Sequence, residues 1–228
     1  MTAFEYKEKR SANVALLHGL GRASLSMAYL ANRLQRAGYS PCNISYPSHK
    51  HPVKKLAMDF VLPAIEQCFR YGSEPIHFVT HSLGGIIVRQ LAASKANIKI
   101  GRVVMLAPPN GGSEVVDTLS KWPFFGAVNG PAGKELGTSE NDLPRSLGPA
   151  PFEVGIIAGN RTINPLLSKM IEGENDGRMS IENTKLEGMA AFLVLPVSHP
   201  LIMLDRRVAE QTIHFLEHGL FQKSPSAS

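Results

Sequence analysis

The sequence predicts an α/β protein in which a mostly parallel sheet is covered by helices on both faces. Short, continuously apolar runs punctuate the chain, and amphipathic segments at helical spacing lie between them. Strands that alternate with helices form parallel sheets, and continuous apolarity is typical of strands buried on both faces. A chain of 228 residues can bury one substantial core. We therefore expect a single α/β domain over residues 1–221.

The predicted strands are short apolar runs rich in Val and Ile. They comprise residues 14–17, 76–79, 103–106, 154–158 and 191–195. The segment CNISYP, residues 42–47, is a weaker sixth candidate.

Four helical patterns separate the strands. The first follows Ser24 and ends at the stop signal Gly38, and the second covers residues 53–72 with a kink or break expected at Pro63. The third covers residues 83–96. The last runs from Leu201 to Leu216, with Pro200 in its first turn and Gly219 beyond its end.

Residues 108–150 interrupt this alternation, because they are rich in Gly and Pro and poor in periodicity. We expect a cap-like insertion over the sheet. Its aromatic residues Trp122, Phe124 and Phe125 could line an apolar pocket or belong to the core. Residues 222–228, QKSPSAS, are expected to form a disordered tail.

Charge and cysteine content limit the partners of the chain. The formal net charge is +5, but the basic residues are scattered, which argues against a nucleic-acid partner. Cys42 and Cys68 are the only cysteines, with no metal-type spacing and no nearby second pair. A disulfide framework is therefore not expected, and a reducing compartment is the default. No secretory signal or membrane span is apparent, and the cytoplasm is the expected location.

Ser82 stands at the junction of an apolar strand and a buried helix, in the segment THSLGG. A sharp turn there would lift the hydroxyl above the sheet and place it near helical N–H groups. Gly84 and Gly85 give the space that such a turn needs, whereas Thr80 occupies a position where glycine is usual. From S-x-G alone a serine N-cap is the simpler interpretation, but strand, serine, glycine pair and helix together favour a nucleophile.

The segment HGLG, residues 18–21, closes an earlier strand. Its backbone at Leu20, together with the backbone N–H of Leu83, could form an oxyanion hole. A plain glycine-rich turn is the alternative.

His199 is the preferred base among eight histidines, because it lies between the last strand and the last helix. That position is the carboxyl edge of the sheet, where ligands of open α/β folds bind. His81 adjoins Ser82 in a sharp turn, so the two side chains should diverge. His18 is expected to brace its loop, and His49 and His51 to be solvated.

Asp176 is the preferred acid, in a turn between the strands at 154–158 and 191–195. It gives the chain order Ser82, Asp176, His199, which is the order of one hydrolase fold. Glu172 and Glu174 remain rivals, and an Asp-Gly turn without catalytic role is the alternative.

Together these motifs, HGLG, HSLGG, DGRMSIENT and SHPLIM, resemble those of the α/β-hydrolases, and among them the small bacterial lipases and carboxylesterases. The resemblance covers about residues 13–218. It departs from the family at Thr80, where glycine is usual, and in the segment DGRMSIENT, where Ser180 falls earlier than the family's serine and Thr184 could take the place of that serine. It implies an α/β-hydrolase fold with a short cap, a Ser82-His199-Asp176 triad, oxyanion donors at Leu20 and Leu83, and no cofactor or metal.

The resemblance further implies hydrolysis of a small-molecule or lipid-like ester through an acyl-enzyme. We expect short- to medium-chain esters. An acyltransferase or amidase with the same triad, and a degenerate hydrolase that serves as a binding module, remain alternatives.

Overall fold

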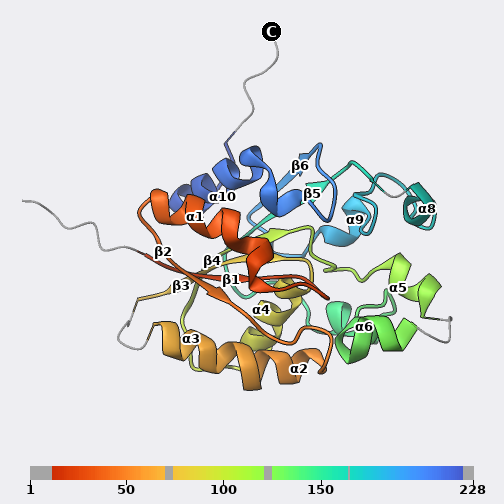
Figure 1. Ribbon diagram of the computed structural model, residues 1–228, viewed down its shortest axis with the longest axis horizontal. Helices are drawn as coiled ribbons and strands as arrows, with labels where there is room; N and C mark the ends of the chain where they lie inside the picture. Colours follow the sequence, from red (N-terminus) through yellow and green to blue (C-terminus); the bar gives the residue numbers. More distant parts are fainter. Residues whose placement is uncertain (1–11, 70–73, 121–124, 164, 223–228) are drawn as a thin grey trace, which may run out of the picture.

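The computed structural model describes residues 12–69, 74–120, 125–163 and 165–222. Its centre is a six-stranded sheet with the order β2-β1-β3-β4-β5-β6, in which every pair is parallel (Figure 1). The strands are β1 (Asn13–Leu17), β2 (Ser40–Ile44), β3 (Ile76–His81), β4 (Ile100–Leu106), β5 (Val154–Gly159) and β6 (Ala191–Leu195). The predicted α/β class and its parallel sheet are confirmed. The five predicted apolar runs all lie on strands, whereas the weaker candidate at 42–47 only overlaps β2, which ends at Ile44.

Two groups of helices cover the two faces of the sheet. Helices α1 (Ala28–Arg36) and α10 (Arg206–His218) lie above the sheet in Figure 1, and α2 (Val53–Lys55), α3 (Leu62–Cys68) and α4 (Leu83–Ala93) lie below it. Successive strand residues alternate between the two layers: Ala15 and Leu17 pack into the core on the α4 face, whereas Val14 and Leu16 pack into the core on the α10 face. Both faces are therefore apolar, which explains the continuous apolar runs in the sequence.

The helix expected over residues 53–72 is not broken at Pro63. A π-helical segment, Leu56–Val61, joins α2 to α3, and the N–H of Leu62 donates to the carbonyl of Ala57. This wider turn lies directly before the proline, where an α-helical carbonyl would otherwise clash with its ring.

The start of the last helix also differs from the prediction. Pro200 is not in its first turn, because a 3₁₀ turn, Ile202–Leu204, comes first. Helix α10 begins after Asp205, whose side chain accepts a hydrogen bond from the backbone N–H of Arg207 at 2.8 Å. Gly219 has a φ of 74° and ends the helix as predicted.

The insertion at 108–150 contains regular structure that the sequence did not indicate. It includes α5 (Glu114–Leu119), α6 (Phe125–Lys134) and α7 (Leu143–Ser146). Helices α5 and α6, with α8 (Pro165–Ser168) and α9 (Ile181–Thr184), gather to the right of the sheet in Figure 1. Trp122 and Phe124 lie outside the described residues. So does the predicted tail apart from Gln222, whose backbone bonds the side chain of Gln211.

Cys42 and Cys68 form a disulfide, which corrects the expectation of reduced cysteines. The bond joins edge strand β2 to the end of α3, and the two residues are 26 positions apart in the chain. Their proximity is a consequence of tertiary structure, because α3 packs beside β2, and sequence spacing did not indicate it.

None of the helices in the four described ranges has the combined length and apolarity needed to cross a bilayer.

Candidate active site

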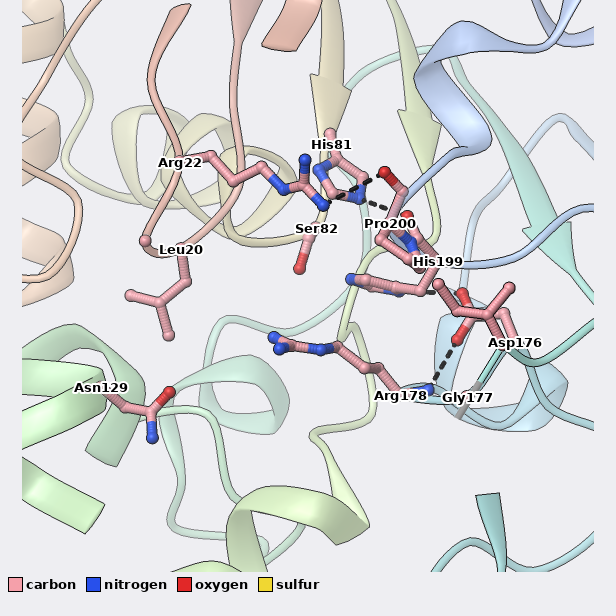
Figure 2. A pocket seen from close by; sticks show the side chains of 12 residues that line it. Leu20, Arg22, His81, Ser82, Asn129, Asp176, Gly177, Arg178, His199 and Pro200 are labelled. Atoms are coloured by element: carbon pink, nitrogen blue, oxygen red, sulfur yellow. Dashed lines mark hydrogen bonds and ion pairs between the residues drawn. The ribbon is translucent and has the colours of Figure 1, made fainter. Parts of the chain in front are cut away.

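Ser82 occupies a sharp turn between β3 and α4. Its φ of 51° and ψ of −119° are rare for a residue with a side chain, and such a conformation costs on the order of 1–3 kcal/mol unless its surroundings impose it. Two hydrogen bonds hold the turn: the N–H of Ser82 donates to the carbonyl of Leu106 at 2.9 Å, and the N–H of Gly85 donates to the carbonyl of Ser82 at 3.0 Å. The Ser82 side chain consequently faces a cavity at the carboxyl edge of the sheet (Figure 2).

Gly84 allows α4 to approach the sheet closely. A Cβ atom on Gly84 would lie 2.6 Å from the carbonyl oxygen of Leu17 in β1, so a larger residue would push the helix away. Thr80, where glycine is usual, is fully buried, and its hydroxyl donates to the carbonyl of Val104 at 3.4 Å. The turn therefore accommodates threonine with its polar atom satisfied.

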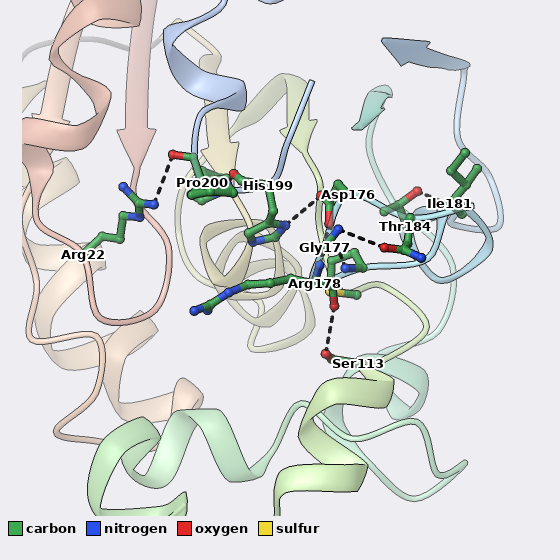
Figure 3. Close-up of polar contacts among 12 residues, drawn as sticks. Arg22, Ser113, Asp176, Gly177, Arg178, Ile181, Thr184, His199 and Pro200 are labelled. Carbon is green, nitrogen blue, oxygen red and sulfur yellow. Dashed lines mark hydrogen bonds and ion pairs between the residues drawn. The ribbon is translucent and has the colours of Figure 1, made fainter. Parts of the chain in front are cut away.

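His199 and Asp176 meet at the same edge from two different loops. Nδ1 of His199 lies 2.8 Å from Oδ2 of Asp176, and the two residues are 4% and 1% exposed (Figure 3). Because a carboxylate only accepts hydrogen bonds, Nδ1 carries the proton and Nε2 is left as an acceptor. The N–H of His199 also donates to the carbonyl of Asp176 at 3.0 Å, which fixes one loop to the other.

Backbone amides hold the second oxygen of Asp176. Its Oδ1 accepts from the N–H groups of Arg178 and Met179 at 3.0 and 2.8 Å. Gly159, at the end of β5, makes room for this loop, since a Cβ there would lie 3.0 Å from the Cβ of Asp176. The carboxylate is therefore buried and fixed in direction.

The rival acids are placed differently. Glu172 and Glu174 lie in the same loop as Asp176, but both are exposed. Ser180 caps α9 and donates to Glu114 Oε1 at 2.7 Å, and Thr184 donates to the carbonyl of Ile181 at 2.6 Å. Ser180 and Thr184 thus have local structural roles.

His81 also lines the cavity, but its ring is bonded to the backbone of His199. Its Nε2 donates to the carbonyl oxygen of His199 at 3.1 Å, and the two rings are 4.9 Å apart. Burial, followed by the charges near it, holds the pKa of His81 well below its usual value. His81 therefore stays neutral and supports the backbone of His199.

The HGLG turn follows β1 and is braced as the sequence predicted for His18. The rings of His18 and Tyr46 stack with centroids 4.1 Å apart, and the Tyr46 hydroxyl donates to the carbonyl of His18. Leu20, within this turn, lies at the cavity wall. Leu83 directly follows Ser82 and is the first residue of α4. Within the described part of the chain, no acceptor takes the backbone hydrogen of Leu20 or Leu83.

The cavity in front of Ser82 has a volume of about 570 Å³. Leu20, Asp176 and His199 also line it. Across the described ranges, no group of three or more His, Cys, Asp or Glu side chains is placed to hold a metal ion.

Two further residues of the cavity were missed by sequence reasoning. Arg22 and Arg178 enter it beside Ser82 (Figure 2). Their positions in the sequence could have indicated them: Arg22 directly follows HGLG, and Arg178 lies within DGRMSIENT, two residues after Asp176. The scattered distribution of basic residues along the sequence does not distinguish these two arginines from the others.

A family model described as the alpha/beta hydrolase family matches residues 14–208. Among solved structures, the mature lipase BlEst2 of Bacillus licheniformis superposes with a TM-score of 0.73 at 19% identity, covering 94% of this chain and 96% of that one. Phospholipase PlaB of Legionella pneumophila gives a TM-score of 0.70 at 16% identity, covering 92% and 60%.

A metagenomic carboxyl esterase, MGS0156, gives a TM-score of 0.66 at 17% identity, covering 85% of this chain and 66% of that one. No curated protein matches the sequence significantly. Likeness at these identities shows the fold, and the family match extends over most of the chain. The protein therefore belongs to the α/β-hydrolase family.

Proposed function

We propose that the protein is a serine carboxylic-ester hydrolase, and that Ser82, His199 and Asp176 form its catalytic triad. The observation that carries this proposal is the buried pairing of His199 Nδ1 with Asp176 Oδ2 at 2.8 Å in the cavity that Ser82 faces. A serine hydroxyl is a poor nucleophile unless a base removes its proton, and an orienting carboxylate keeps that base in the required tautomer.

In the first step, His199 Nε2 takes the proton of Ser82 while Oγ attacks the ester carbonyl carbon. The N–H groups of Leu20 and Leu83 then donate to the oxyanion that forms, and their freedom from protein acceptors supports this role. Asp176 stabilises the imidazolium without accepting its proton.

The tetrahedral intermediate then collapses: His199 gives its proton to the departing alcohol oxygen, and an acyl-enzyme remains on Ser82. A water molecule, deprotonated by His199, attacks the acyl carbon, and the acid leaves as Ser82 regains its proton. These steps need no metal or organic cofactor.

A second, apolar cavity supports short- to medium-chain acyl groups. It has a volume of about 210 Å³ and shares Ser82 and His199 with the first cavity. Its walls include Val115, Val116 and Leu136 of the insertion. These aliphatic side chains come from the same insertion as Trp122, Phe124 and Phe125, whose side chains lie outside the described part of the chain.

The test is hydrolysis of p-nitrophenyl esters of increasing acyl length by the purified protein. We expect turnover that is greatest for short or medium chains and is reduced at least about 10³-fold in Ser82→Ala. Equal rates for the two proteins would overturn the proposal. Product analysis with an added alcohol, and with the matching anilides, separates hydrolysis of esters from acyl transfer and amide cleavage.

A further inference from the structure

Two arginine side chains converge on the space in front of Ser82. Arg22 comes from the loop after β1 and Arg178 from the loop that carries Asp176, and Figure 2 shows their guanidinium groups on either side of the serine. Loops that are far apart in the chain thus place two positive charges in one cavity.

Neither guanidinium group is neutralised by the protein. In the described ranges, neither Arg22 nor Arg178 forms an ion pair with a carboxylate; Arg22 Nη2 donates only to the carbonyl of Pro200, at 3.1 Å. Asp176 is the acid that lines this cavity, and both of its oxygens are occupied by His199 and by backbone N–H groups.

The two charges also disfavour each other. Burial and, next, the charge of Arg178 lower the pKa of Arg22. Both residues are exposed, so solvent screens this repulsion, and a bound anion would offset what remains of it. Guanidinium groups present fork-shaped sets of donors that fit phosphate and carboxylate oxygens, so an anionic ligand matches both their charge and their geometry.

The arrangement of the two cavities indicates which part of an ester would carry that anion. The smaller, aliphatic cavity suits the acyl chain. Arg178 borders both cavities, whereas Arg22 lines only the larger one and therefore marks the side away from the acyl chain. Arg22 bonds the carbonyl of Pro200, which directly follows His199. Because His199 delivers a proton to the departing alcohol oxygen, the alcohol portion would lie on its side of the site.

We propose that Arg22 and Arg178 form an anion-binding subsite, and that the preferred substrate is an ester whose alcohol portion carries a phosphate or carboxylate group. This inference rests on the proposed function. The covalent chemistry is unchanged: the bond between the acyl carbon and the alcohol oxygen breaks, the anionic alcohol leaves with the proton from His199, and water releases the acid from Ser82.

The kinetic test compares matched esters. Two of the esters carry an anionic alcohol portion: the butyrate ester of 4-hydroxybenzoate and the butyrate ester of 4-hydroxyphenyl phosphate. The neutral comparator is the butyrate ester of methyl 4-hydroxybenzoate. We expect the ratio of kcat/KM for anionic over neutral esters to fall at least about tenfold in Arg22→Gln and in Arg178→Gln. The Gln side chain keeps hydrogen-bonding capacity without charge.

Arg161→Gln is the matched control, because this exposed arginine lines a neighbouring surface hollow and not the cavity of Ser82. Its ratio of kcat/KM for anionic over neutral esters should equal that of the wild type. An unchanged ratio in both subsite variants would overturn the proposal. A charge preference that appears only for acyl-side anions, measured with p-nitrophenyl succinate and its methyl ester, would also overturn it.

A binding measurement keeps this inference separable from the proposed function. Calorimetric titration of the Ser82→Ala protein with phenyl phosphate requires no turnover. We expect salt-sensitive binding that is lost in the Ser82→Ala protein carrying both arginine substitutions. Equal binding with and without the arginines contradicts the subsite, whatever the esterase assay shows. Arginine-dependent binding without ester turnover by the wild type would support the subsite and contradict the proposed hydrolase function.

Discussion

His199 Nδ1 lies 2.8 Å from Asp176 Oδ2, and neither side chain is more than 6% exposed. This buried pair links the two loops that follow β5 and β6, and it determines which nitrogen of the imidazole can act as a base. The contribution of this hydrogen bond to turnover can be measured, because a substitution of Asp176 removes the carboxylate and leaves Ser82 in place.

Replacing Asp176 by Asn should lower kcat by about 10⁴-fold, because the amide favours the wrong imidazole tautomer. The protein should stay folded by circular dichroism. Glu174→Gln is the matched control, since Glu174 lies in the same loop but is exposed, and its rate should stay near that of the wild type. Little loss in Asp176→Asn together with a large loss in Glu174→Gln would move the role to the rival acid.

The sequence predicted the central strands clearly and edge strand β2 only weakly, because the two kinds of strand differ in burial. Central strands such as β5 are buried on both faces and read as apolar runs, whereas Pro41, Cys42 and Asn43 of edge strand β2 are only half-buried. The helices of the insertion escaped notice because Gly130, with a φ of 64°, and the adjacent Pro131 interrupt α6.

The candidate site could be anticipated in part because three motifs end on adjacent segments of one sheet edge. The disulfide and the arginine pair could not, since each depends on residues that only tertiary structure brings together. The disulfide also removes the cysteine argument for a reducing compartment, on which the expected cytoplasmic location partly depended.

Acid should destabilise the protein through His81. Burial, and then the neighbouring positive charges, hold the pKa of His81 well below 6.5, so the unfolded chain binds a proton that the folded chain does not. The free energy of unfolding should therefore fall as the pH drops below 6.5, by up to about 1.4 kcal/mol per pH unit for this residue.

Urea unfolding of His81→Phe and His81→Gln at about pH 7.5 and about pH 5.5 tests this relation. Both variants should lose less stability on acidification than the wild type does. The remaining loss would come from His18 and His77, whose pKa values burial also lowers. The exposed His49, replaced by Gln, is the control. An identical pH dependence in all the proteins would contradict the role of His81.

Removal of the Cys42–Cys68 disulfide should destabilise the fold. Closing a loop between residues 26 positions apart lowers the entropy of the unfolded chain, which stabilises the fold by about 3.5 kcal/mol in the chain-entropy model. The double variant Cys42→Ser/Cys68→Ser should unfold at lower urea concentration than the oxidised wild type. Dithiothreitol should lower the wild-type midpoint and leave that of the variant unchanged; a wild type insensitive to the reductant would argue against the bond in solution.

Arg89 of α4 should be important for anchoring the insertion. It is 3% exposed, and its guanidinium donates to the carbonyls of Asn110, Pro144 and Gly148 at 3.3, 2.6 and 2.8 Å. Burial lowers its pKa to about 10, so it remains charged near neutral pH.

Arg89→Ala should lower the free energy of unfolding by about 2 to 4 kcal/mol, because buried carbonyl groups lose their donor. Arg145→Ala, in the same insertion, removes only the exposed ion pair with Glu140 and should cost less than about 1 kcal/mol. Similar losses in the two variants, measured by urea unfolding, would show that the anchoring contacts contribute little.

The central claim is that Ser82 is an activated nucleophile, and a fluorophosphonate probe tests it most directly. The probe phosphonylates a serine only where a base removes its proton and an oxyanion site accepts the product. We predict rapid labelling of the wild type with the adduct on Ser82 by peptide mass spectrometry, and no labelling of Ser82→Ala. Absence of an adduct on the folded wild type, or equal labelling of Ser82→Ala, would contradict the account.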